Sequence, residues 1–258
     1  MRSATEPWSL SGTIEESSRP RLKAFIIHLK RAVERRPQVE RLVAALPIPA
    51  EIVDAVDGEC LDVAEAGKVY RPRLHNPRYP FRLSKSEIAC FLSHRKAWQA
   101  IVDQELDAGF VVEDDVELDE FFPRSFASAL ACLEPEDFVR FPFRADREAG
   151  PELFNDGKTR IIAPSPVGLG MVAQLVGRSA ARHLLAATQR FDRPVDTTVQ
   201  MKWVTGVAPK SVVPGGVHEI SRKLGGSMIR RKKTVPDKLR HEILRPLYRI
   251  RIAIRSRR

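Results

Sequence analysis

A strand–helix–strand pattern near the beginning of the chain most constrains what this sequence can fold into. Residues 24–29 (Ala-Phe-Ile-Ile-His-Leu) form a short apolar run typical of a buried strand. Residues 34–46 follow with apolar positions at helical spacing, and Pro47 and Pro49 end that helix. Residues 52–56 predict a second strand, which ends at an Asp-Gly turn. Because such units join parallel strands, the pattern predicts an α/β fold with a mostly parallel, mixed sheet flanked by helices.

The next segment contains the clearest helix start in the chain. Ser84 and Glu87 form an S-x-x-E capping box, and apolar positions up to residue 105 line one face behind it. Before it, residues 59–82 contain three prolines and little pattern, which predicts a loop or a weakly ordered insertion. After it, residues 110–112 predict another buried strand.

The remaining sequence alternates between strand and helix patterns. We expect strands at 138–143, 161–163 and 170–176, a helix at 179–189 and another that follows Thr197 and runs through Trp203, with residues 212–216 closing the domain. Residues 1–20 are polar and lack periodicity, which is typical of a flexible leader. We therefore expect a leader at 1–20, one domain at 21–225 and a tail at 226–258.

The net charge of +10 belongs to the tail. Residues 230–258 contain 12 Lys/Arg and 2 Asp/Glu, which leaves 31 of each kind for residues 1–229. A neutral domain with a basic tail argues against a nucleic-acid footprint over the whole domain, and aromatic stacking residues are nearly absent from the tail. We expect no nucleic-acid partner and an anionic surface that meets the tail.

The tail also has an apolar pattern. Leu239, Ile243, Leu247, Ile250 and Ile254 fall at helical spacing among arginines, which suits a helix lying on an anionic membrane. Pro246 predicts two short helices rather than one, and strand-like alternation at residues 250–254 competes with the helix pattern. Docking on the domain or a solvated tail are the alternatives.

The sequence also bears on location. It contains no run of about 18 apolar residues and no secretory signal pattern, and its three cysteines are scattered. We therefore expect a cytoplasmic protein, attached peripherally to the inner face of the cytoplasmic membrane if the tail binds there.

An acidic cluster follows the strand at 110–112. Glu113, Asp114 and Asp115 stand where open α/β sheets bind ligands, beyond the carboxyl end of a strand. Side chains alternate along an extended chain, so Glu113 and Asp115 are expected to point the same way and Asp114 the other. Two carboxylates on one side suit a hard divalent cation such as Mg²⁺ or Mn²⁺, and a solvated acidic turn is the alternative.

Four blocks together resemble glycosyltransferase family 25, whose bacterial members build lipooligosaccharide and lipopolysaccharide. They are Phe-Ile-Ile-His-Leu at 25–29 with the arginines at 35–36, Ala-Val-Asp-Gly at 55–58, the helix block from Leu83 to His94 with Ala97 and Trp98, and Val-Glu-Asp-Asp-Val at 112–116. A weaker block includes residues 174–176 and 194–196, so the similarity runs from about residue 22 to 200. The resemblance implies a GT-A-like fold and inverting transfer of a hexose, galactose or glucose, from a UDP-sugar to a lipooligosaccharide, lipopolysaccharide or other glycan acceptor.

The resemblance also implies site residues. Glu113 and Asp115 would ligate Mn²⁺ or Mg²⁺, with Asp115 counted among the catalytic residues because the cation neutralises the departing diphosphate. Asp196 is the candidate general base, and a helix N-cap is its alternative role. The predicted donor-binding residues are Leu29, Arg35, Asp57, Glu87, Ser93, His94, Glu113 and Asp114.

Several of these donor-site residues have a structural alternative. Ser93 could bond only to its own helix, Glu87 could serve only the capping box, and His94 could be a core-edge histidine. Asp57 could belong to a simple Asp-Gly turn, and Arg35 could lie on a solvated helix face.

Three positions depart from the family pattern. His28 replaces an asparagine, Ala89 a glycine and Gln174 an aromatic residue, which puts the first-loop donor contact and the specificity in doubt. These departures motivate a second hypothesis, a nucleotide-sugar- or glycan-binding protein without turnover. A third is a basic-tailed membrane or nucleic-acid adaptor.

Overall fold

The computed structural model describes residues 20–225 and 235–256. Residues 1–19 of the predicted leader, and the arginines and lysines at 230–233, lie outside the described residues. Among the described residues, no helix is long and apolar enough to cross a lipid bilayer.

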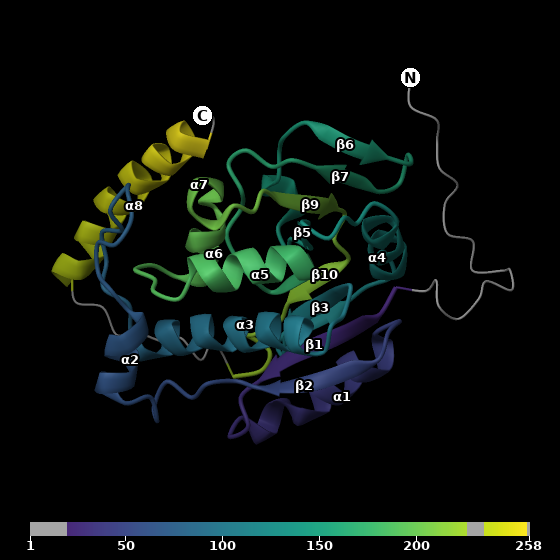
Figure 1. Cartoon of the computed structure of the whole chain (residues 1–258), viewed down its shortest axis with the longest axis horizontal. Helices are drawn as coiled ribbons and strands as arrows, with labels where there is room; N and C mark the ends of the chain where they lie inside the picture. Colours follow the sequence, from purple (N-terminus) through teal and green to yellow (C-terminus); the bar gives the residue numbers. More distant parts are fainter. Residues whose placement is uncertain (1–19, 226–234, 257–258) are drawn as a thin grey trace, which may run out of the picture.

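Eight strands form one mixed sheet in the order β2-β1-β3-β8-β5-β9-β7-β6 (Figure 1). Strand β1 pairs parallel with β2 and β3, β5 pairs parallel with β9, and the other neighbours in the sheet run antiparallel. The predicted α/β class and the parallel strand–helix–strand unit are therefore confirmed. The strands are β1 (Leu22–His28), β2 (Ala50–Asp54), β3 (Ala108–Glu113), β5 (Phe138–Arg140), β6 (Glu152–Asn155), β7 (Arg160–Ile162), β8 (Ala173–Gly177) and β9 (Pro209–Val213).

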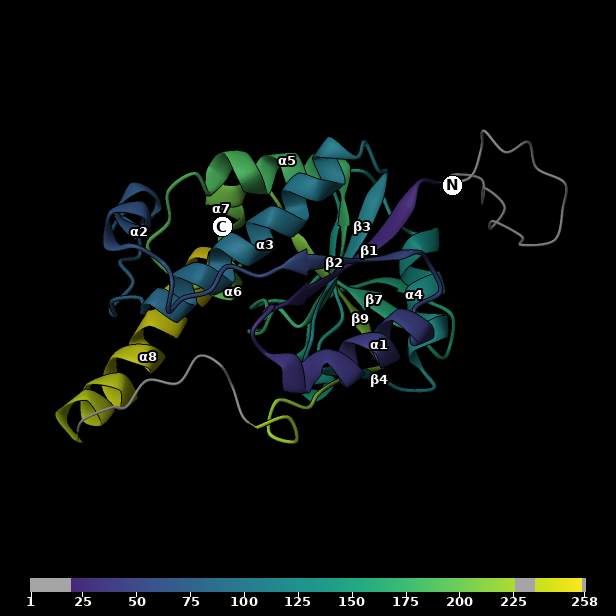
Figure 2. The ribbon, with the colours of Figure 1, turned by 90° about the horizontal axis from the view of Figure 1, so that it is seen from below.

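Alternating side chains on the central strands build two cores, one on each face of the sheet. Phe25 and Val111 pack into one core, whereas Ile26 and Phe110 pack into the other. Helices α3 (Lys85–Asp103) and α5 (Arg178–Ala187) cover the first face, and α1 (Arg36–Ala45) and α4 (Phe122–Ala131) cover the second (Figure 2). A sheet buried on both faces holds the ends of its strands rigidly, which is what a site at those ends requires.

The capping box predicts the start of α3 correctly. The Ser84 hydroxyl accepts from the Glu87 backbone N–H, and the Glu87 carboxylate accepts from the Ser84 N–H at 2.7 Å. The long amphipathic helix behind this cap buries Trp98 completely and carries His94 toward the end of β3.

Two predicted segments that precede the tail are corrected by the structure. Residues 59–82 contain a helix, α2 (Val63–Val69), which Asp62 caps by accepting from the Ala64 N–H. The helix predicted to follow Thr197 and run through Trp203 is two short helices, α6 (Val195–Val199) and α7 (Lys202–Thr205), separated at Gln200 and Met201. Both errors concern helices of seven residues or fewer, whose periodicity is too short to read.

The tail forms one helix, α8 (Val235–Ser256), with Pro246 inside it. The prediction of two helices is wrong because the turns after Pro246 are held by tertiary packing. Tyr248 and Ile252 are buried against Met201, and the Tyr248 hydroxyl lies 2.6 Å from Nη1 of the fully buried Arg193. Figure 1 shows α8 beside α6 and α7.

A two-stranded sheet lies next to the acidic cluster. Strand β4 (Val116–Leu118) continues from that cluster and pairs antiparallel with β10 (Val217–Glu219), which places Glu219 opposite Val116. The Ile220 N–H donates to the Asp115 carbonyl at 2.8 Å. This pairing fixes the backbone of the acidic cluster and brings a fourth carboxylate to it.

Candidate functional site

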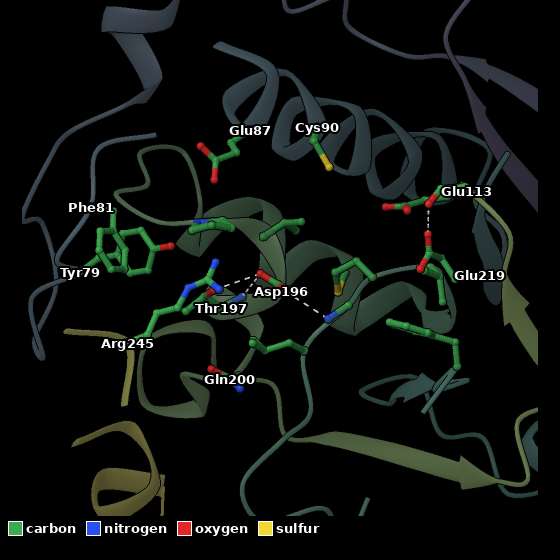
Figure 3. Close-up of a pocket in the computed structure, with 18 of the residues that line it drawn as sticks. Tyr79, Phe81, Glu87, Cys90, Glu113, Asp196, Thr197, Gln200, Glu219 and Arg245 are labelled. Atoms are coloured by element: carbon green, nitrogen blue, oxygen red, sulfur yellow. Dashed lines mark hydrogen bonds between the residues drawn. The ribbon is translucent and has the colours of Figure 1, made fainter. Parts of the chain in front are cut away.

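Two cavities meet at the end of β3. The larger has a volume of about 390 Å³ and lies among α3, α6, α8 and the segment at 169–172 (Figure 3). The smaller, of about 150 Å³, lies among the ends of β1, β2 and β3 and the first turns of α3. Both are lined by Cys90, Glu113 and Asp115, so two carboxylates stand where the cavities join.

Glu113 and Asp115 face the same cavities, as expected, but not through strand alternation, because β3 ends at Glu113 and Asp114 and Asp115 lie in the turn that follows it. Glu113 and Asp115 line both cavities, whereas Asp114 is buried and turned toward β1 and α1. One Asp114 oxygen lies 2.6 Å from Nη1 of Arg35, and the other lies 2.7 Å from Nδ1 of His28. Asp114 is therefore held in a buried ion-pair network, and His28, the departure from the family pattern, is part of it.

Asp115 lies in an unbalanced acidic environment. Burial, with the nearby Glu113 carboxylate as the next cause, raises the pKa of Asp115 to about 7 despite the opposing charge of Arg35. Asp114 and Glu219 also raise this pKa. Oδ1 of Asp115 is buried and has no hydrogen-bond partner among the described residues, and Oδ2 lies 3.3 Å from Arg35. Carboxylate oxygens of this kind are the ligands that a hard divalent cation prefers.

A thiol and an imidazole, which are softer metal ligands than carboxylates, lie at the same junction of the two cavities. One ligand atom each from Cys90, His94 and Glu113 lies within 4.8 Å of the others. However, burial, followed by the charges of the surrounding carboxylates, raises the pKa of the Cys90 thiol, and a thiol is a poor metal ligand. Nε2 of the fully buried His94 lies 3.1 Å from Oε1 of Glu113. The buried His94 ring therefore contacts the Glu113 carboxylate at the junction of the cavities.

The smaller cavity gathers most of the predicted donor-binding residues. Its lining includes Leu29, Arg35, Asp57, Ser93, His94, Glu113 and Asp114, together with the apolar Ile27, Ala55, Val56 and Ala89. Segments that are far apart in the sequence thus converge on one cavity beside the acidic cluster.

Several of these residues already have protein partners. Arg35 is buried between Asp114 and Asp115, so it does not lie on a solvated helix face. The Ser93 hydroxyl donates to the Ala89 carbonyl and accepts from the Val56 N–H, which ties α3 to the end of β2. Asp57 accepts from the Glu59 N–H and from Nε of Arg31, and these bonds lower its pKa. The bonds of Arg35, Ser93 and Asp57 to other protein groups therefore mainly fix the shape of the smaller cavity.

The larger cavity holds Asp196 and Glu87. Asp196 is not an N-cap, because Pro194 occupies that position of α6. Its Oδ1 accepts from the Thr197 N–H at 2.6 Å, and its Oδ2 accepts from the Gly170 N–H at 3.2 Å (Figure 3). Gly170 has φ of +97°, and a Cβ there would lie 2.6 Å from Phe143, so this contact requires glycine. The Asp196 carboxylate is thereby fixed in the cavity that Glu113 and Asp115 also line.

Sequence reasoning missed several lining residues. Glu219 reaches the site only through the pairing of β10 with β4, and Tyr79 comes from the segment predicted as a loop. Arg245, Tyr248 and Arg249 come from α8, whose basic residues were interpreted as a membrane-facing surface. The basic composition of the tail was the available signal, but it does not show which arginines face the domain. Gln174, predicted to affect specificity, lines neither cavity and donates from Nε2 to the Val111 carbonyl within the sheet.

Comparison with known proteins supports the resemblance. Residues 21–199 match the family described as "Glycosyltransferase family 25 (LPS biosynthesis protein)". Human procollagen galactosyltransferase 2 is 36% identical over 113 residues, which are 43% of this chain and 18% of that protein. A glycosyltransferase 25 family member of Drosophila melanogaster is 36% identical over 103 residues (39% and 17%), and the mouse inactive glycosyltransferase 25 family member 3 is 34% identical over 105 (40% and 18%).

The extent of these similarities limits what they imply. The chain aligns with less than a fifth of the length of these relatives. Among solved structures, A197 from STIV superposes with a TM-score of 0.37 at 11% identity, covering 83% of this chain and 99% of that one, which is too low to assign the fold. The family match at residues 21–199 includes β1 through α6, and therefore Glu113, Asp115 and Asp196, but it does not include α8.

Proposed function

Because the chain belongs to glycosyltransferase family 25, we propose that it transfers a hexose, galactose or glucose, from a UDP-sugar to a glycan acceptor, with inversion at the sugar carbon. The observation that carries this proposal is the junction of the two cavities at Glu113 and Asp115. A donor in the smaller cavity would present its sugar at that junction, and an acceptor in the larger cavity would reach it from the Asp196 side. The name of the human relative favours galactose.

In the proposed reaction, the acceptor hydroxyl oxygen forms a bond to the anomeric carbon while the bond from that carbon to the diphosphate breaks. The hydroxyl proton passes to the Asp196 carboxylate, and the bonding electrons leave with the nucleoside diphosphate. Asp196 suits the role of base because its carboxylate is fixed by Thr197 and Gly170 within the larger cavity. A geometry fixed before reaction lowers the entropic cost of reaching the transition state.

We further propose that Glu113 and Asp115, with Glu219, hold Mn²⁺ or Mg²⁺. Bound there, the cation would neutralise the charge that develops on the leaving diphosphate. The orphaned Asp115 oxygen and the raised Asp115 pKa support this role. His94 would keep Glu113 in place, and the Arg35–Asp114 pair would keep the neighbouring backbone from moving.

A screen of UDP-sugars against simple glycosides tests the proposal by measuring released UDP with Mn²⁺, with Mg²⁺ and with EDTA. We expect release with UDP-galactose or UDP-glucose that requires the cation. Glu113→Gln should abolish it, and Asp196→Asn should abolish transfer while donor binding persists. Glu117→Gln is the matched control, because Glu117 belongs to the same acidic segment but is exposed and paired with Lys223. Cation-independent release, or equal losses in the Glu117 variant, would contradict the assignment.

One observation favours a second candidate, a donor-binding protein without turnover. A relative among those compared is named inactive, and Arg35 already places a positive charge near Asp115. The same screen separates the two functions, because such a protein would bind the UDP-sugar and release no UDP with any acceptor.

We also propose that the enzyme works at an anionic membrane surface on the cytoplasmic side, where lipid-linked acceptors such as lipooligosaccharide precursors are exposed. The described part of α8 supports this location. Leu247, Ile250 and Ile254 are about half exposed and lie on the helix face opposite Tyr248 and Ile252, among exposed arginines.

A further inference from the structure

A third cavity adjoins the larger one on the side away from the acidic cluster. Its volume is about 220 Å³, and Arg144, Arg147 and Arg249 are among the residues that line it. The two cavities adjoin, because both are lined by Leu169, Gln200 and Arg249. We call it the arginine cavity.

The positive charge of the arginine cavity is not balanced by its own carboxylate. Glu148 also lines the cavity, but its Oε1 lies 2.8 Å from Nη1 of the buried Arg140, and its Oε2 accepts from the Ser211 hydroxyl. Among the described residues, Arg144, Arg147 and Arg249 form no salt bridge. Three guanidinium groups therefore remain available to a ligand in this cavity.

The three arginines come from two elements, an arrangement that suits binding of an anionic group. The Arg144 guanidinium stacks over the Phe143 ring at 4.8 Å from its centroid, and Phe143 itself lines the larger cavity. Arg147 lies on the same short turn as Arg144, whereas Arg249 approaches from α8. Guanidinium groups from two separate elements suit a phosphate or carboxylate, because each presents a planar fork of N–H donors.

The two adjoining cavities differ in charge. Carboxylates predominate in the lining of the larger cavity, which also contains Arg245 and Arg249, whereas the arginine cavity has three arginines and a single carboxylate that is already paired. An acceptor could place its reactive hydroxyl at Asp196 and an anionic substituent beside the guanidinium groups of the arginine cavity. The reverse orientation would place the anion beside the carboxylates of the larger cavity.

We infer that the acceptor carries an anionic group, a phosphate or a carboxylate, which binds Arg144, Arg147 and Arg249. This inference rests on the proposed transferase function and adds the chemical class of the acceptor. Arg249 belongs to α8, outside the part shared with the family at 21–199. Acceptor recognition is therefore contributed in part by a segment that the family match does not include.

The test uses the full chain with UDP-galactose, Mn²⁺ and three acceptors: methyl glucoside, methyl glucoside 6-phosphate and methyl glucuronide. The variants are Arg147→Ala and Arg249→Ala. Arg251→Ala is the control, since Arg251 is an exposed α8 arginine that lines none of the three cavities. UDP release above the rate without acceptor gives kcat and KM for each glycoside.

We expect at least one anionic glycoside to have a KM about tenfold below that of the neutral one, as for one charge-assisted hydrogen bond. Comparing the phosphate with the carboxylate identifies the preferred group. Arg147→Ala and Arg249→Ala should each raise that KM about tenfold. Arg147→Ala, whose side chain does not line the larger cavity, should in addition have little effect on the KM of the neutral acceptor. Equal use of all three glycosides, or an equal rise of KM in Arg251→Ala, would overturn the inference.

Direct binding keeps this test independent of turnover. If no acceptor supports UDP release, calorimetric titration of the same three glycosides in the presence of UDP and Mn²⁺ decides the question. Binding of an anionic glycoside that is weakened by Arg147→Ala supports the site even where the transferase proposal fails. No binding of either anionic glycoside excludes it.

Discussion

Adjacent carboxylates at the end of β3 have opposite surroundings and should respond differently to the same substitution. Asp114 is buried between Arg35 and His28, so Asp114→Asn removes the nearer of the two carboxylates that contact the buried Arg35 guanidinium. We expect a loss of about 3 kcal/mol in the free energy of unfolding, measured by urea denaturation. Asp115→Asn should lose no stability but should lower UDP release at least a hundredfold, about 2.7 kcal/mol in the barrier. Similar stability losses in both variants would show that the two carboxylates are not sorted in this way.

The raised pKa of Asp115 makes a prediction about pH in the absence of metal. Its pKa is about 7 in the folded protein, against the ordinary value of 3.8 for an exposed aspartate carboxyl. Folding therefore favours the protonated form, and the stability contribution of this group is lost as pH rises from about 4 through 7. In EDTA, Asp115→Asn should be more stable than the wild type at pH 8 by at least about 1 kcal/mol, the equivalent of one pKa unit.

Thermal unfolding at pH 5 and pH 8 checks this expectation. The advantage of Asp115→Asn should shrink at pH 5, and Mn²⁺ at pH 8 should raise the Tm of the wild type and not of the variant. A Tm difference between the two proteins that does not change with pH would show that Asp115 ionises normally.

At the scale of elements, a buried arginine of the domain holds the hydroxyl of the α8 tyrosine that packs on Met201. Arg193 is fully buried and bonds to Asp192, to the carbonyls of His75 and Pro77, and to the Tyr248 hydroxyl. Tyr248→Phe keeps the ring but removes one partner of this cation, which should cost about 1–3 kcal/mol. Hydrogen exchange of α8 should accelerate while that of α3 stays unchanged. Leu247→Ala, on the exposed face of α8, should leave exchange in both helices unaffected.

The elements that could be predicted from sequence are those whose signals are local. The capping box of Ser84 and Glu87 and the apolar strand β3 depend on neighbours within a few residues, and the structure confirms both. The strand expected at 138–143 is confirmed only at Phe138–Arg140. The single helix through Pro246 could not be predicted, because its stability depends on Tyr248 meeting Arg193, which lies 55 residues away in the chain.

The same reasoning applies to the candidate site. The acidic segment at the end of β3 could be located from the sequence, but the turn that directs Asp115 toward the same cavities as Glu113 could not. The cavity that both share with Asp196 could be proposed only through the family resemblance. Glu219 joins them through long-range strand pairing, and Arg249 through the docking of α8. Neither position has a local pattern that distinguishes it from other charged residues of the tail or of the loops.

At the scale of the whole molecule, α8 has one face that lines the larger cavity and an opposite face that exposes apolar side chains. Arg245, Tyr248 and Arg249 line the larger cavity, whereas Leu247, Ile250 and Ile254 are exposed on the opposite face. One helix could therefore hold an acceptor on one side and lie against anionic lipid on the other, which would place the site next to a membrane-borne acceptor.

Vesicle binding of the full chain tests this arrangement. Each of Leu247, Ile250 and Ile254 would bury its remaining exposed half in lipid, which is worth about 1 kcal/mol per side chain. Substituting all three with serine should therefore lower partitioning onto phosphatidylglycerol vesicles about a hundredfold, and UDP release without acceptor should not change. Leu153→Ser, an equally exposed apolar position on β6, is the control. Binding that persists in the triple variant, or that is as strong on neutral phosphatidylcholine vesicles, would show that α8 does not contact lipid through this face.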